Sequence, residues 1–170
     1  MSESYAHIKT GAITSGSIIE EFKATAAIEM WSPAVLAVAG TNEEMARVTG
    51  SSSAGQETVI GIIVGPKRAS GKAADAAGDS VQVCVFGICK LKVLGNSVNI
   101  ALGDILRTSA TAAKADKLVP YDAPATVNEA NLQTEWDLKA NKAFAKALKA
   151  STADDDIIPV IVSGIGGMIA

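Results

Sequence analysis

The longest regular pattern in the chain covers residues 80–93, with the sequence SVQVCVFGICKLKV. Apolar side chains occupy most odd-numbered positions, and lysines and a glutamine occupy even ones. Because successive side chains of a strand point to opposite faces, this alternation predicts a β-strand. The segment is longer than most strands, so we expect a bend or bulge at Gly87, where the missing Cβ is tolerated. Before Gly87, Cys84 and Phe86 are also apolar, which predicts burial of that half on both faces.

Shorter apolar runs, bounded by Gly, Pro, Asn or Asp, predict further strands. We expect these strands at residues 34–39, 45–48, 57–64, 98–102, 105–107, 110–118 and 157–162. Pro159 cannot donate a hydrogen bond within a sheet, so the last strand should lie at an edge or turn that position away from its partner. Short strands between turns, without a long helix, indicate an all-β protein, a small antiparallel β-barrel or sandwich.

Residues 136–150 (WDLKANKAFAKALKA) fit two structures. Strong helix formers and a stripe of Leu138, Phe144 and Leu148 favour a helix. An internal echo favours a strand, since DSVQVCVFG at residues 79–87 aligns without gaps with DIIPVIVSG at residues 156–164, and each follows another apolar run. We predict a strand at residues 143–148 and leave residues 128–138 open to a helix.

We divide the chain into an extended N-terminal arm, residues 1–30, and a β-barrel or sandwich domain, residues 31–170, with an insertion at about residues 120–138. The arm has no clean hydrophobic period, which is typical of a mobile segment. If it is ordered, we expect a neighbouring subunit to order it. A frayed terminus is the alternative.

Composition narrows the class of protein. At 170 residues, one domain with a real core is the default. The chain is 48% hydrophobic but only 4% aromatic, which suits a compact β protein of small branched side chains. A net charge of −3 provides no cationic field for nucleic acid or an anionic membrane. We also expect no transmembrane helix and no signal peptide, and therefore synthesis in a cytoplasm.

Residues 65–72 (GPKRASGK) suggest a phosphate-binding loop, but that motif requires four residues between its glycines and a Ser or Thr after the lysine. Here five residues intervene and Ala73 follows. The loop is then either a solvated β-loop or a basic tip that contacts an acidic neighbouring surface through Lys67, Arg68 and Lys72.

Other candidate reactive residues lack the required spacing. Cys84 and Cys89 are five apart, which on a regular strand places them on opposite faces, unless a bulge at Gly87 restores the phase. His7 has no nucleophile or orienting group near it in sequence. The acidic residues 154–156 lack the alternate spacing of a calcium loop. We therefore predict no catalytic, cofactor or metal site, and a structural or binding protein rather than an enzyme.

A family resemblance rests on five segments in a fixed order. They are VIGII at residues 59–63, AAGDSVQV at 76–83, VNIALGDIL at 98–106, AFAKAL at 143–148 and IPVIVSG at 158–164. The order is a glycine-marked apolar strand, an AAGD turn, a valine-alternating strand, a GD turn, and a repeat of the first two. Over residues 34–164 the chain resembles the capsid decoration (cement) proteins of tailed viruses. Its N-terminal arm and its insertion are longer than expected for that family.

The resemblance implies a homotrimer on the outer surface of an icosahedral virion, made in the host cytoplasm and without a cofactor. Its partners would be the major capsid protein, whose subunits it would bridge, and further copies of itself. An arm of this kind can add a strand to a neighbour's sheet. We expect shell or subunit contacts in the arm and in the basic loop. The candidate contact residues are Ile13, Ile18, Ile19, Lys67, Arg68 and Lys72.

Two alternatives stay open. A trimeric β-barrel enzyme or ligand-binding module with sites between subunits would bring Asp104, Asp122 and residues 154–156 into one concave pocket with a perturbed acid. A decoration protein would leave them scattered. A microcompartment shell component is the other alternative, which the neighbouring genes would separate from a capsid protein.

Overall fold

The computed structural model describes residues 16–37, 46–53, 58–95, 99–117 and 143–162. Within these ranges the chain forms strands and no helix, so the all-β fold class is confirmed. The strands are β1 (Ile18–Lys23), β2 (Pro33–Ala37), β3 (Arg47–Gly50), β4 (Val59–Gly65), β5 (Ser80–Leu94), β6 (Ile105–Thr108), β7 (Ala115–Lys117), β8 (Ala145–Ala147) and β9 (Asp154–Val162).

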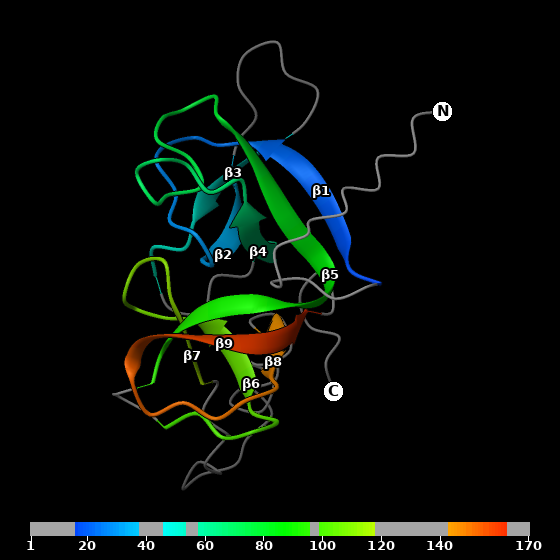
Figure 1. Ribbon diagram of the computed structural model, residues 1–170, viewed down its shortest axis with the longest axis vertical. Helices are drawn as coiled ribbons and strands as arrows, with labels where there is room; N and C mark the ends of the chain where they lie inside the picture. The colour runs from blue at the N-terminus through cyan, green and yellow to red at the C-terminus, as the bar shows by residue number, and fades with distance from the viewer. Residues whose placement is uncertain (1–15, 38–45, 54–57, 96–98, 118–142, 163–170) are drawn as a thin grey trace, which may run out of the picture.

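The long strand β5 belongs to both halves of the molecule (Figure 1). Its first half pairs with β1 and β4, and its second half pairs with β9 and β7. The change of partners falls at Gly87, whose φ of +109° confirms the predicted bend. A Cβ atom at Gly87 would lie 2.6 Å from the Cα of Ser17, so the close approach of the two chain segments also requires glycine here.

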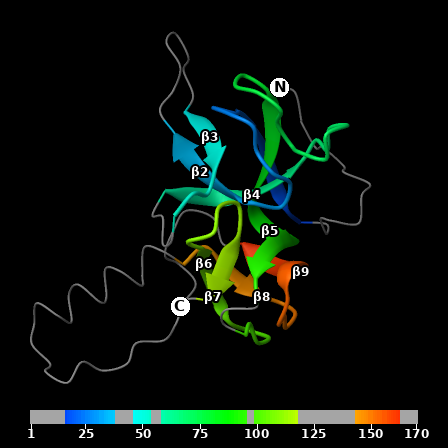
Figure 2. The same cartoon turned by 90° about the vertical axis from the view of Figure 1, so that its left-hand side faces the viewer.

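The second half of β5 forms a closed five-stranded barrel with β7, β6, β8 and β9. The ring closes because β9 pairs with both β5 and β8. Alternate residues point inward, among them Leu91, Leu106 and Ile158, all fully buried. This barrel lies at the opposite end of the molecule from β1, β2 and β3, as two perpendicular views show (Figures 1 and 2).

The first half of β5 belongs to a sheet in the order β3-β2-β4-β5-β1. The sheet curls until Ala24 bridges Val48 of β3, and the Thr25 N–H donates to the Val48 carbonyl at 3.0 Å. Neighbouring residues of β4 face different cores, since Ile62 packs with the barrel interior and Ile63 with the core inside the curled sheet. β4 is therefore buried on both faces, as its unbroken apolar run predicts.

Residues 16–30 do not need a neighbouring subunit to order them, contrary to our expectation. β1 runs antiparallel to β5 of the same chain, and Ala24, Ile28 and Met30 are buried in the core of the curled sheet. The physical reason is that β5 would otherwise leave a row of backbone groups unpaired opposite Ile18–Lys23. Only residues 1–15 of the predicted arm lie outside the described residues.

Several boundaries shift from those predicted. β8 confirms a strand within residues 143–148, but it covers only Ala145–Ala147. The predicted strand at residues 98–102 is wrong for its described part, where Ile100 makes a single bridge to Ser151. β9 is not an edge strand despite Pro159, because it lies between β5 and β8. The predicted insertion at residues 120–138 and the possible helix at residues 128–138 lie outside the described residues.

Candidate contact surface

The predicted apolar contacts lie where β1 begins. Ile18 is 51% exposed and lies directly opposite Phe86 of β5, which is 48% exposed. Ile19 is partly buried against the barrel core, so it contributes more to folding than to an outer surface. Ile13 lies outside the described residues. Of the three predicted isoleucines, Ile18 is thus the one that the structure places on an exposed apolar surface, together with a phenylalanine that the sequence did not single out.

The predicted basic contacts lie in the loop of residues 66–78, beside the other end of β1. Two of them already have partners within the chain. Arg68 donates to the Ala73 carbonyl at 3.0 Å and pairs with Asp79 at 3.4 Å, and Lys72 approaches Glu29 at 3.9 Å. Lys67 makes no ion pair with a described residue and is exposed. The loop therefore presents less unpaired positive charge than its sequence suggests.

Two turns of matching construction stabilise the starts of β5 and β6. Gly78 and Gly103 each have φ of +88°, a conformation that favours glycine. The aspartate that follows each glycine accepts a hydrogen bond from a backbone N–H three residues earlier, at 3.0 Å for Asp79 and 2.7 Å for Asp104. The Gly78 N–H donates to the carbonyl of Ala24, just after β1, and the Gly103 N–H donates to the carbonyl of Ala147, at the end of β8, each at 2.8 Å. The two GD motifs of the sequence are thus structural turns.

The aspartates of these turns and of the β8–β9 turn are held in their charged form. Two backbone N–H groups, from Ala76 and Asp75, lower the pKa of Asp79. Partial burial opposes ionisation of Asp104, but the Ala101 N–H and Lys117 outweigh it and lower its pKa.

A pH dependence of stability follows from these pKa shifts. Because the folded-state pKa of Asp104 lies below the unfolded value of about 3.9, its charge stabilises the fold above that pH, and the contribution is lost as pH falls through the folded pKa. Asp79 and Asp154 act in the same direction, whereas Asp116 opposes them because burial raises its pKa. Urea denaturation should show near-constant stability from neutral pH to about pH 5 and a decline below about pH 4.

The variant Asp104→Asn is the matched test, since its amide oxygen can still accept the Ala101 hydrogen bond. It should be less stable than the wild type at neutral pH and lose less stability on acidification. An unchanged acid dependence in this variant would show that Asp104 does not contribute to it.

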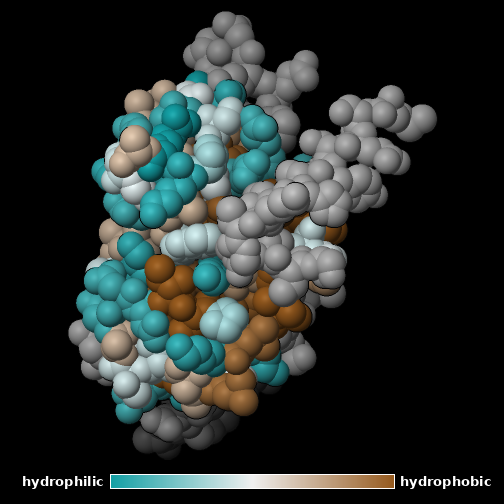
Figure 3. Space-filling model, in the orientation of Figure 1, coloured by the Kyte–Doolittle hydropathy of each residue, from teal (hydrophilic) through white to brown (hydrophobic). Residues whose placement is uncertain are grey.

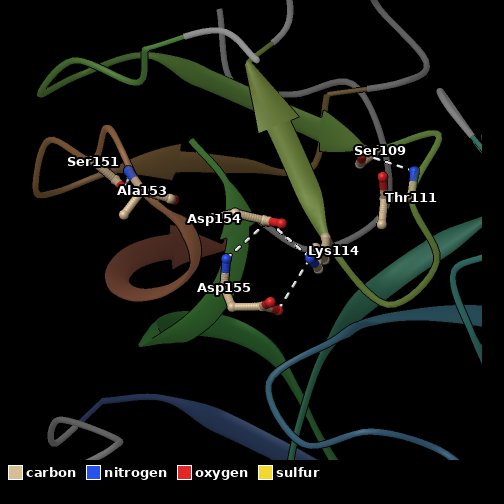
Figure 4. A network of polar contacts seen from close by, with 7 residues as sticks. All are labelled: Ser109, Thr111, Lys114, Ser151, Ala153, Asp154 and Asp155. Carbon is tan, nitrogen blue, oxygen red and sulfur yellow. Dashed lines mark hydrogen bonds and ion pairs between the residues drawn. The ribbon is translucent and has the colours of Figure 1, made fainter. Parts of the chain in front are cut away.

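A lysine joins the segment before β7 to the start of β9 (Figure 4). The Nζ of Lys114 lies 2.8 Å from Asp154 and 3.1 Å from Asp155. These carboxylates raise the pKa of Lys114, with Asp154 as the largest cause, and the lysine in turn lowers the pKa of Asp154. The nearby hydroxyls of Ser109 and Ser151 accept hydrogen bonds from backbone N–H groups of their own turns. This network ties together two turns at one end of the barrel.

The aspartates that could have formed an enzyme pocket belong to different ion pairs. Asp104 pairs with Lys117 at 2.9 Å, whereas Asp154 and Asp155 pair with Lys114. Asp122 lies outside the described residues. In the part of the chain that the structure describes, no group of three or more His, Cys, Asp or Glu side chains could hold a metal ion. The same part contains no helix long and apolar enough to cross a membrane.

The two cysteines do not point to opposite faces, contrary to the regular-strand prediction. Cys84 and Cys89 are both buried in the barrel core, because the bend at Gly87 restores the phase between them. Both are free thiols. The Cys89 thiol lowers the pKa of Cys84 by hydrogen bonding, and the same contact, together with burial, raises the pKa of Cys89. Buried thiols of this kind behave as small apolar side chains.

The outside of the barrel carries an exposed apolar surface that was not predicted from the sequence. On β9, Ile158 and Val160 point inward, so Ile157, Pro159 and Ile161 point outward. Ile157 is 39% exposed and Ile161 is 36% exposed. Apolar side chains gather on this side of the molecule, where β9 and the second half of β5 face the viewer (Figure 3).

The strand register defines the neighbours of these three residues. Ile88, Lys90 and Lys92 of β5 lie opposite Ile161, Pro159 and Ile157, respectively, and Lys146 of β8 lies opposite Ile161 on the other side. Directly opposite residues of antiparallel strands share a face. We call this set of seven residues the β9 face. Phe86, which precedes the bend at Gly87, and Ile18 opposite it are exposed apolar residues beyond this end of the face.

No family model and no curated protein matches this chain. Among solved structures, the chain is similar to the N base of the head fiber protein gp8.5 of bacteriophage phi29. The sequence identity is 14%, the TM-score is 0.44, and the alignment covers 90% of this chain and 100% of that chain. A TM-score of this size supports no conclusion about the function of this chain.

Proposed function

We propose that this chain is a capsid decoration protein that binds the outer surface of an icosahedral viral head and bridges neighbouring major capsid subunits. The observation that carries the proposal is the β9 face, an apolar column on the outside of a closed barrel. A barrel strand needs apolar residues only on its inner side, so isoleucines on the outer side indicate contact with another molecule. The strand and turn order of the family described above supports the same assignment.

The proposed work is mechanical and requires no reacting group. Each buried square ångström of apolar surface contributes about 25 cal/mol, so even a modest face yields useful binding once it is covered. Repetition over a lattice multiplies such a contact, because each bound copy holds neighbouring subunits close together. The Gly103–Asp104 turn and the Lys114 network tie elements of the barrel together, which limits the entropy lost on binding. Association of the chain as a homotrimer is part of the proposal.

The enzyme alternative lacks a comparable observation. Asp104 and Asp154 each form an ion pair with a lysine of the same barrel end, an arrangement that explains their lowered pKa values without a substrate. Such pairs stabilise turns and leave neither carboxylate positioned as a general base.

Cosedimentation with heads tests the proposal. Heads of the virus that encodes this chain, prepared without it, should bind the purified protein saturably, at a fixed ratio to the major capsid protein. Unassembled major capsid protein serves as the control and should bind more weakly, because it offers no lattice. Failure of intact, folded protein to sediment with heads would refute the proposed function.

A further inference from the structure

We infer that the β9 face docks on an acidic protein surface with an apolar centre, which on the proposed function is the outer surface of the head. The inference names the chemistry of the partner and rests on that function. It is carried by the positions of Lys90, Lys92 and Lys146 around the exposed isoleucines of β9.

The face has an apolar centre and a basic rim. Its central column is Ile161, Pro159 and Ile157, all on β9. Lys90 and Lys92 flank this column on the β5 side, and Lys146 flanks it on the β8 side. Neighbouring strands lie about 4.8 Å apart, so each lysine is within side-chain reach of the column. An apolar centre with a polar rim is the usual anatomy of a protein–protein interface.

The charges of this rim are not neutralised by the described part of the chain. Most other cations there have a carboxylate partner: Arg68, Lys72, Arg107, Lys114 and Lys117. Lys90, Lys92 and Lys146 make no ion pair with any described residue, and the residues opposite them in the register are apolar. Within the described residues, three cations without a carboxylate partner therefore surround one apolar face, in a chain whose net charge is −3.

This combination favours a folded acidic protein over other occupants. Ile157, Pro159 and Ile161 are stiff side chains on a closed barrel, so little conformational entropy is lost when a rigid partner covers them. A second copy of this chain is a poorer match. In a twofold dimer the β9 face would meet the same face of the other copy, so lysines would lie against lysines. The exposed carboxylates of Glu20 and Glu21 lie on β1, outside the β9 face. Charge complementarity therefore favours carboxylates on a different protein.

Two double charge reversals form the closing experiment. Lys90→Glu with Lys92→Glu changes the β9 face, and Lys67→Glu with Lys72→Glu changes the basic loop by the same total charge. Affinity for heads is measured by cosedimentation at several NaCl concentrations, after circular dichroism and thermal unfolding have shown that each variant is folded. The face variant should bind about tenfold more weakly or worse, whereas the loop variant should stay within about twofold of the wild type.

Two further variants separate charge from apolar contact. Lys90→Gln with Lys92→Gln should weaken binding and flatten its dependence on NaCl, since screening acts on the lost charges. Ile157→Ser with Ile161→Ser should also weaken binding about tenfold, but with the salt dependence of the wild type. If the variant with two glutamates fails to fold, the variant with two glutamines tests the role of the β9 face in its place.

The outcomes distinguish this inference from the proposed function. If the wild type binds heads and the β9 face variants bind equally well, the inference is wrong and the proposed function stands. If the wild type does not bind heads, the proposed function fails first. Lysine-dependent binding to phosphatidylcholine–phosphatidylglycerol vesicles, or self-association in sedimentation velocity that the face variants abolish, would assign the face to a membrane or to a second copy and overturn the inference.

Discussion

Replacing Gly87 with alanine is expected to lower the free energy of unfolding by more than about 3 kcal/mol. A new Cβ would lie 2.6 Å from the Cα and 2.9 Å from the Cβ of Ser17, so backbone rather than a mobile side-chain tip would have to move. The φ of +109° adds conformational strain for any residue with a Cβ. Ser17 immediately precedes β1 and its hydroxyl donates to the Ile88 carbonyl at 3.1 Å, so its displacement should loosen β1 from β5.

Gly71→Ala is the matched control for this prediction. Gly71 has φ of +87°, but no atom lies within 4 Å of the position its Cβ would take. It should therefore show only the conformational cost, about 1 kcal/mol. Urea denaturation of both variants at neutral pH makes the comparison, and losses of equal size would show that the close approach of Ser17 to Gly87 does not limit the fold.

Deleting residues 2–27 is expected to prevent folding. The deletion removes all of β1, which pairs with β5 from Ile18 to Lys23, and buried Ala24 with it. Val81, Val83 and Cys84, fully buried in the intact chain, would lose a neighbouring strand. The loss of several ladder hydrogen bonds at about 1 kcal/mol each, together with this burial, is comparable to the 5–15 kcal/mol or so that stabilises a typical domain.

Deletion of residues 2–15 provides the contrast, because it keeps every contact described for β1. The shorter deletion should unfold cooperatively near the wild-type temperature, whereas the longer one should lack a cooperative transition in circular dichroism and calorimetry. A cooperative, wild-type-like transition in the longer deletion would show that β1 is dispensable. The shorter deletion also tests whether residues 2–15, which include Ile13, contribute to head binding.

Much of the fold follows from local sequence signals. Alternation along β5, its length and Gly87 predict both the strand and its bend, and the two GD turns predict where β5 and β6 begin. β1 was not predicted as a strand of the domain because IIEEFK has no period of two. It forms since the β5 backbone supplies partners for its N–H and C=O groups, and backbone pairing places little demand on side-chain pattern. The single bridge of Ile100 to Ser151 likewise depends on a partner distant in sequence.

The contact surface was harder to predict, for a different reason. In DDDIIPVIV of β9, both faces are largely apolar, so the sequence cannot tell which side fills the barrel. Only the closed ring shows that Ile157 and Ile161 point outward. Conversely, Arg68 looked available for binding because its partner Asp79 is distant in the sequence. Only the fold of the loop brings the two side chains together. Ile18 was singled out from the sequence and is exposed, but the strand register that places Phe86 beside it could not be predicted locally.

Cryo-electron microscopy of heads with and without the bound protein tests the central claim most directly. We predict additional density on the outside of the shell that fits the barrel, with β9 and Lys90 facing the capsid and each copy touching more than one major capsid subunit. Density that places the β9 face toward solvent, or heads that carry no additional density at saturating protein, would contradict it.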